Sequence, residues 1–139
     1  MAGEDQRVTG GCACGALRYE AGPVQAVDAC HCGQCRRASG TTPVVWATVA
    51  SATFRWVKGE PRYYQSSDHG RRGFCAVCGT PVIFDSSRWP KELDLTIGSL
   101  DEPEAHPPQR ESFLRDKLSW VRADPALPQL PGELPGEDD

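Results

Sequence analysis

The chain has 139 residues, of which 24% are charged and 39% apolar, which is ordinary for one compact soluble domain. Its net charge of −4 argues against nucleic-acid binding, which needs a concentrated basic face. No apolar run approaches the roughly 20 residues of a membrane helix, and the first ten residues lack the apolar core of a secretory signal. We therefore expect a cytoplasmic protein that binds neither nucleic acid nor membranes.

Most of the chain predicts short β-strands joined by turns, in keeping with its 12 prolines and 14 glycines. β-Branched and aromatic residues, or alternating apolar and polar residues, mark six segments as strands: 16–21, 44–49, 53–57, 62–66, 80–84 and 92–98. The segment 33–39 is the best candidate for a helical turn, and 111–120 fits a strand with a turn better than a helix. The predicted fold class is mainly β, with short antiparallel strands and little helix.

The end of the chain differs in composition from this β-rich body. Residues 123–139 are rich in proline and acidic residues and have no apolar period, which is typical of a flexible tail. We therefore expect a folded domain over 8–122 and an acidic, proline-rich tail over 123–139. A core of this size is modest, so metal crosslinks would stabilise it appreciably.

Seven cysteines fall into three groups, and their odd number excludes complete disulfide pairing. In a reducing compartment, such closely spaced cysteines bind metal more often than they form bridges. Cys75 and Cys78 form a C-x-x-C knuckle followed by glycine, which supplies two of the four ligands that tetrahedral zinc prefers. Cys12 and Cys14, flanked by glycines, offer the other two. We predict that these four cysteines form a structural zinc site.

The run CHCGQC leaves Cys30, Cys32 and Cys35 for a second zinc ion. Cys35 would lie in the first turn of the short helix, whose positive end favours thiolates. Three protein ligands with an open position are what a catalytic zinc requires. His31 lies next to two candidate ligands and is therefore poorly placed to be the fourth.

Three other interpretations of the cysteines remain open. The seven thiols could be free and reduced. They could hold a single zinc, with the remaining three cysteines redox-active or completed by His31. An iron–sulfur cluster is the third possibility, although such clusters normally take four cysteines.

Six motifs along the chain resemble, in order, those of the glutathione-dependent formaldehyde-activating enzyme family, which also contains centromere protein V. They are GGCACGALRYE, CHCGQCRRASGT, FRWVKGEPRYYQSS, RRGFCAVCGTPV, LTIGSLDEPE and KLSW, and they extend from about Gly10 to Trp120. Members of this family are mostly small β proteins with two zinc sites and a fold described as a β-tent. The resemblance implies the same two sets of zinc ligands, with a glutathione thiol interacting at the three-cysteine site.

The resemblance also implies a function. It indicates a carbon–sulfur lyase that makes or breaks the adduct of glutathione with an aldehyde, such as S-hydroxymethylglutathione, at the three-cysteine zinc. Arg36, Arg37 and Arg71 are candidates to bind the two glutathione carboxylates. The alternative is a non-catalytic zinc module that binds or carries glutathione or docks a protein partner. A histidine that many relatives carry after the LDEP turn is absent from 107–112, and His106 lies just upstream.

Overall fold

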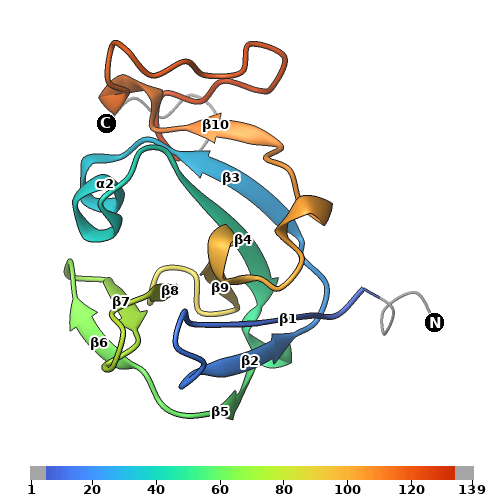
Figure 1. The fold of residues 1–139 in the computed structure, drawn as a ribbon. Helices are drawn as coiled ribbons and strands as arrows, with labels where there is room; N and C mark the ends of the chain where they lie inside the picture. Colours follow the sequence, from blue (N-terminus) through green and yellow to red (C-terminus); the bar gives the residue numbers. More distant parts are fainter. Residues whose placement is uncertain (1–5, 134–139) are drawn as a thin grey trace. The chain divides into compact units, whose positions relative to one another are not determined.

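The computed structural model describes residues 6–133 and is mainly β, as the sequence predicts. These residues form ten strands and one α-helix, together with short 3-10 turns (Figure 1). They divide into two compact units, the first comprising 6–26 and 47–106 and the second 27–46 and 107–133. No helix within this range is long and apolar enough to cross a membrane.

A small antiparallel sheet in the first unit has the order β1-β2-β5, with bounds Val8–Gly11, Arg18–Ala21 and Arg55–Lys58. Gly10 of β1 lies opposite Tyr19 of β2. A Cβ at Gly10 would lie 2.4 Å from both the Tyr19 hydroxyl and the Ser99 carbonyl oxygen, so only glycine permits this approach. The Tyr19 ring in turn packs against Phe54 and Trp56, with centroids 5.5 and 6.0 Å away.

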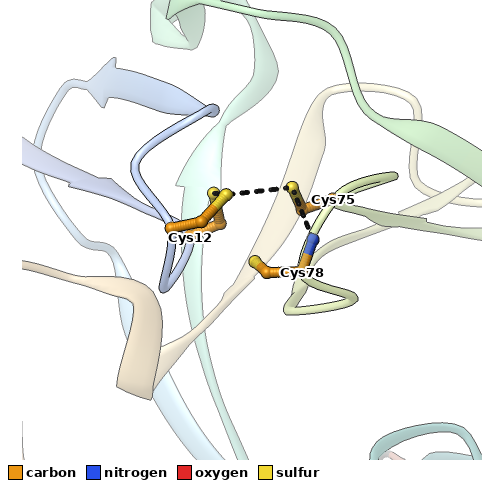
Figure 2. A group of neighbouring side chains, drawn as sticks. Cys12, Cys75 and Cys78 are labelled. Carbon is orange, nitrogen blue, oxygen red and sulfur yellow. Dashed lines mark hydrogen bonds between the residues drawn. The ribbon is translucent and has the colours of Figure 1, made fainter.

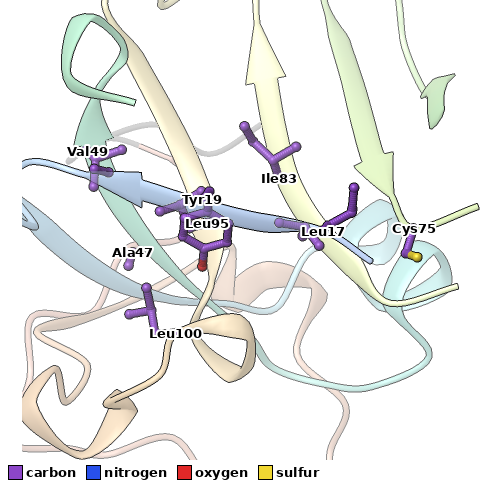
Figure 3. Close-up of a cluster of buried hydrophobic side chains, with 10 residues drawn as sticks. Leu17, Tyr19, Ala47, Val49, Cys75, Ile83, Leu95 and Leu100 are labelled. Atoms are coloured by element: carbon purple, nitrogen blue, oxygen red, sulfur yellow. The ribbon is translucent and has the colours of Figure 1, made fainter. Parts of the chain in front are cut away.

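The second sheet of the first unit has the order β4-β9-β8-β7-β6. Its strands are β6 (Arg62–Gln65), β7 (Gly70–Phe74), β8 (Pro81–Ser86), β9 (Glu92–Thr96) and the Ala47–Ala50 end of β4 (Val44–Ala50). Buried side chains from both sheets form one hydrophobic core, drawn in Figure 3: Leu17, Tyr19, Ala21, Ala47, Val49, Cys75, Val82, Ile83, Leu95 and Leu100. The core thus includes one cysteine of the predicted structural site, Cys75.

The second unit contains β3 (Ala26–Cys30), the helix α2 (Gly33–Ser39), the start of β4 and β10 (Arg110–Ser112), in the sheet order β10-β3-β4. The helix begins and ends where the sequence predicts. Gly40 ends it with a φ of 73°, a left-handed conformation that glycine adopts without strain. Strand β10 pairs with β3 in parallel, which differs from the expected antiparallel arrangement. A parallel pair needs a long connection, and more than 70 residues of chain separate these two strands.

Residues 124–132 follow β10 and form a segment that we call the strap. Glu111 N–H donates to the Pro128 carbonyl at 3.0 Å, and Leu130 N–H donates to the Glu111 carbonyl at 2.9 Å. Phe113 N–H donates to the Gly132 carbonyl at 3.0 Å, and the Leu130 side chain is buried. The strap lies within the range for which the sequence predicts a flexible tail, whereas 134–139 lie outside the described residues.

Candidate metal centres

The first cysteine cluster belongs to the first unit and consists of Cys12, Cys14, Cys75 and Cys78. One pair lies in the turn after β1, and the other lies in the turn after β7. Figure 2 shows the side chains of Cys12, Cys75 and Cys78 gathered where these two turns meet. Gly15 and Gly79 follow the two pairs with φ values of 83° and 81°, which lets each turn close tightly.

The spacing of the sulfur atoms fits a tetrahedral zinc ion. All four lie within 4.8 Å of one another. Cys14 Sγ is 3.7 Å from Cys12 Sγ and 3.8 Å from Cys75 Sγ. Four sulfurs bound to zinc at about 2.3 Å in a tetrahedron are separated by about 3.8 Å. In addition, the N–H of Leu17 donates to Cys12 Sγ at 3.2 Å, which favours the thiolate that zinc needs.

A threonine connects the two halves of this cluster. Thr80 Oγ1 lies 3.1 Å from Cys78 Sγ and accepts a hydrogen bond from the Ala13 N–H, also at 3.1 Å. Hydrogen bonds from the Thr80 hydroxyl and backbone lower the pKa of Cys78 to about 5, which favours the metal-binding thiolate. The sequence pattern does not reveal this role, because a threonine beside a C-x-x-C knuckle has no evident significance until the fold brings Ala13 to it.

The second cluster belongs to the second unit and consists of Cys30, Cys32 and Cys35, whose sulfurs also lie within 4.8 Å of one another. Cys30 ends β3, Cys32 is the N-cap of α2, and Cys35 lies in the first helical turn. Cys30 Sγ is 3.7 Å from Cys35 Sγ, close to the sulfur separation expected around tetrahedral zinc. Cys35 N–H donates to Cys32 Sγ at 3.2 Å, so the helix cap itself aims one of the three ligands.

Crowding of these sulfurs opposes their ionisation. The neighbouring sulfurs of Cys32 and Cys35, together with burial, raise the pKa of Cys30 well above its ordinary value. A divalent cation reverses this effect, because a coordinating thiol is deprotonated. Among residues 6–133, no histidine or carboxylate atom lies within 4.8 Å of all three sulfurs. The cluster therefore offers three protein ligands and suits an ion with one further position for a thiol or water.

His31 lies between two of these cysteines in the sequence, yet its ring bonds elsewhere. The residue is 1% exposed, and its Nε2 donates to Glu111 Oε1 at 2.6 Å. His31 is therefore a buried hydrogen-bonding residue and not a solvated one. Its Nδ1 is buried and has no hydrogen-bond partner in the described part of the chain. No sequence pattern identifies Glu111 as its partner, since 80 positions separate the two residues.

The three candidate arginines occupy two different units. Arg36 and Arg37 lie on α2, the helix that carries Cys35. Arg71 lies on β7 of the first unit, where its Nε and Nη2 both lie 3.1 Å from Asp85 Oδ2. The Arg71 guanidinium also lies over the Tyr63 ring, 3.8 Å from its centroid. Their contacts with glutathione remain a prediction.

The first unit also contains a cavity of about 610 Å³ away from its cysteine cluster. Val8, Val24 and Leu100 supply apolar walls, while Arg7 and His106 add polar groups. His106, the histidine nearest to the position occupied in many relatives, therefore lines this cavity and not a cysteine cluster. No motif in the sequence predicts the cavity.

The fold and the clusters define a class of small, mainly β proteins. Such a protein has one set of four cysteines that could bind zinc and a second set of three. The chain belongs to the glutathione-dependent formaldehyde-activating enzyme family, whose match covers residues 7–116. This range includes all seven cysteines. The resemblance of the sequence motifs to this family is thereby confirmed.

A solved structure shares the fold. It is the crystal structure of a Rhodobacter sphaeroides protein determined as a structural genomics target, with a TM-score of 0.57 and 21% sequence identity. The alignment covers 87% of this chain and 98% of that one. At this identity the likeness supports the fold alone. A comparison with curated proteins finds no match.

Proposed function

We propose that this protein is a zinc-dependent carbon–sulfur lyase that acts on the adduct of glutathione with formaldehyde, S-hydroxymethylglutathione. The observation that carries the proposal is the cluster of Cys30, Cys32 and Cys35, three converging sulfurs without a fourth protein ligand among the described residues. Family membership suggests the substrate class, since the family is named for the glutathione-dependent activation of formaldehyde. The four-cysteine cluster has the complementary role of a structural zinc site.

The reaction couples cleavage of the C–S bond to loss of the hydroxyl proton. When the adduct is cleaved, its C–S bond breaks, the electron pair stays on sulfur, and the hydroxyl group loses its proton as the C=O bond forms. The thiol of glutathione is regenerated when sulfur takes up a proton. A zinc ion at the three-cysteine site would stabilise the sulfur as a thiolate at neutral pH.

The residues of the second unit would hold and orient the substrate. The Cys35 N–H holds Cys32 Sγ at the N-cap of α2, and with Cys30 and Cys35 this sulfur would hold the ion to which the substrate sulfur binds. Arg36 and Arg37, on the same helix, are our candidates for binding the glutathione carboxylates, because a guanidinium matches a carboxylate in two-point geometry. Arg71 would first have to release Asp85, and we give it a lesser role.

Isothermal titration with glutathione tests the binding half of this proposal. The zinc-loaded protein is expected to bind glutathione, whereas Cys32→Ser, which removes one ligand of the second ion, binds it at least about tenfold more weakly. S-Methylglutathione is the matched ligand control, because it keeps both carboxylates but has no free thiol. Equal binding of glutathione by the two proteins, or binding by neither, contradicts the zinc–thiol proposal.

Catalysis is tested separately from binding. Formaldehyde and glutathione combine spontaneously, so the measurement is the exchange rate between ¹³C-formaldehyde and its glutathione adduct by NMR. The loaded protein is expected to raise this rate, and Cys32→Ser is not. Binding of glutathione without any increase in exchange would favour the alternative, a zinc module that carries glutathione.

A further inference from the structure

His31 is attached to β10 through both its backbone and its ring. Its N–H donates to the Ser112 carbonyl at 3.0 Å, and its Nε2 donates to Glu111 Oε1 at 2.6 Å. Because His31 lies directly between Cys30 and Cys32, these two bonds fix the chain at the midpoint of the C-x-C pair. They also direct Nε2 to Glu111, and among the described residues no ring nitrogen of His31 lies within 4.8 Å of all three sulfurs.

Glu111 is itself fixed by the strap. Its second carboxylate oxygen, Oε2, accepts a hydrogen bond from the Asp124 N–H at 2.9 Å. Its backbone N–H donates to Pro128, and its carbonyl accepts from Leu130. Glu111 is 6% exposed. Two contacts with the strap thus hold the backbone of Glu111 and a third holds one carboxylate oxygen, while the other oxygen bonds His31.

A buried carboxylate is costly unless it is fully hydrogen-bonded, so its position between a ligand loop and the strap needs a reason. We propose that Glu111 is a positioning residue of the three-cysteine site, which holds the Cys30–Cys35 loop in its metal-binding shape through His31 and is itself held by the strap. This inference rests on the proposed function, because it assumes a metal ion at the three-cysteine site. Groups that orient a ligand loop raise metal affinity by reducing the ordering that binding requires.

Glu111→Gln is the variant that tests this role with the smallest change in shape. A glutamine has one acceptor oxygen where Glu111 uses two, so when that oxygen accepts from the Asp124 N–H, the side chain can meet the His31 ring only through an amide N–H, which requires the other imidazole tautomer. The affinity of the second metal ion is expected to fall by about 10- to 100-fold. The four-cysteine site belongs to the other unit and is expected to keep its affinity, which makes it an internal reference.

The measurement is a Co²⁺ titration of the metal-free full-length protein against a competing chelator, followed by sulfur-to-cobalt absorption. The ratio of the second to the first dissociation constant is the readout, since a general loss of stability does not change one site selectively. Glu20→Gln is the matched control, because Glu20 Oε2 also accepts a bond, 2.9 Å from Arg55 Nε, but in the first unit. This control is expected to bind both ions as the natural protein does.

Two further variants test whether Glu111 acts through His31 and provide an alternative if Glu111→Gln does not fold. The double variant combines His31→Gln with Glu111→Gln. It should bind the second ion as tightly as whichever single variant binds that ion more weakly, because both changes remove the same contact. If Glu111→Gln does not fold, Asp124→Pro removes the N–H that the strap gives to Oε2, and Asp124→Ala, which keeps this N–H and loses only the carboxylate that accepts from the Ala126 N–H, is its control. Asp124→Pro is expected to weaken the second ion by several-fold and to leave the first unchanged.

The outcomes separate this inference from the proposed function. Binding of only one Co²⁺ ion by the natural protein overturns both. Two ions in the natural protein with an unchanged affinity ratio in Glu111→Gln, or in Asp124→Pro where the former does not fold, overturn the inference alone. An additive loss in the double variant shows that Glu111 does not act through His31 and also overturns it.

Discussion

Arg18 and Asp101 form a two-point ion pair in the first unit, although 83 positions separate them. Arg18 Nη1 lies 3.0 Å from Asp101 Oδ1, and Thr9 Oγ1 donates to Oδ2 at 2.6 Å. The Asp101 N–H also donates to the Thr9 carbonyl at 2.9 Å. Asp101, the first of the two acidic residues in the LDEP turn, therefore attaches that turn to β1 and β2, which is a structural role.

Asp101→Asn is expected to lower the free energy of unfolding by about 0.5–1 kcal/mol at pH 7, since the pair is partly exposed. The Arg18 hydrogen bond and that of Thr9 lower the pKa of Asp101. A lowered pKa gives stability that is present above the ordinary carboxyl pKa and is lost as pH falls through the lowered one. Urea unfolding in steps from pH 7 to pH 2 should show the difference between the two proteins shrinking below the ordinary carboxyl pKa. A difference that stays constant with pH contradicts the ion-pair explanation, and Glu102→Gln is the neighbouring control.

Metal removal is expected to affect the two cysteine clusters differently. The four-cysteine cluster joins residues 61 positions apart, and closing a loop of this length restricts the unfolded chain by about 4 kcal/mol. Cys75→Ser should therefore lose one ion and most of its stability, the more so because Cys75 is buried in the core. Cys32→Ser should lose one ion and remain folded. The metal content and thermal unfolding of the two variants measure this difference. Equal destabilisation would contradict a structural role for the four-cysteine site and a substrate-binding role for the three-cysteine site.

Much of the fold could be predicted because the sequence patterns that determine it are local. The six predicted strand segments each overlap a strand, and the helix at Gly33–Ser39 follows from its flanking glycines. The predicted segment 92–98 ends as a strand at Thr96, because Ile97–Ser99 form a 3-10 turn. Strands β1, β3 and β7 were missed, since their glycines or small residues weaken the local pattern.

The two sets of cysteines were also predictable, since zinc ligands come in short spacings that the sequence displays directly. Their surroundings were not predictable, because those contacts join distant positions. Thr80 meets Ala13 across 67 positions, and His31 meets Glu111 across 80. The pairing of β3 with β10 brings His31 to Glu111, and the meeting of two turns brings Ala13 to Thr80. A single sequence contains no record of either contact.

Thr80→Val is expected to make the four-cysteine site release its metal at a higher pH. The Thr80 hydroxyl is the main cause of the lowered pKa of Cys78, about 5, so its loss lets protons compete for that sulfur at higher pH. An acid titration of the Co²⁺-loaded protein, followed by sulfur-to-cobalt absorption, measures the midpoint of release. Thr42→Val is the matched control, because the buried Thr42 hydroxyl has no hydrogen-bond partner in the described structure. An unchanged midpoint in Thr80→Val would show that the hydroxyl does not act on Cys78.

Tyr19→Phe is expected to lower the free energy of unfolding by about 1 kcal/mol near neutral pH. The variant loses the hydrogen bond between the buried Tyr19 hydroxyl and Ser99 Oγ, which lie 2.6 Å apart. The Ser99 hydroxyl keeps its bond to the Thr96 carbonyl at 2.9 Å, so it is not left without a partner and the loss stays small.

The same variant should behave differently in alkali. Burial raises the pKa of Tyr19 to about 12 from the ordinary 10. Such a raised pKa means that the contribution of Tyr19 is complete below pH 10 and is lost as pH rises through about 12. The natural protein should therefore lose stability over this range faster than Tyr19→Phe, and the difference between them should shrink. Denaturant unfolding at pH 8, 10 and 11 measures it, with the exposed Tyr64→Phe as control. A difference that grows with pH would mean that the Tyr19 hydroxyl ionises without leaving the folded core.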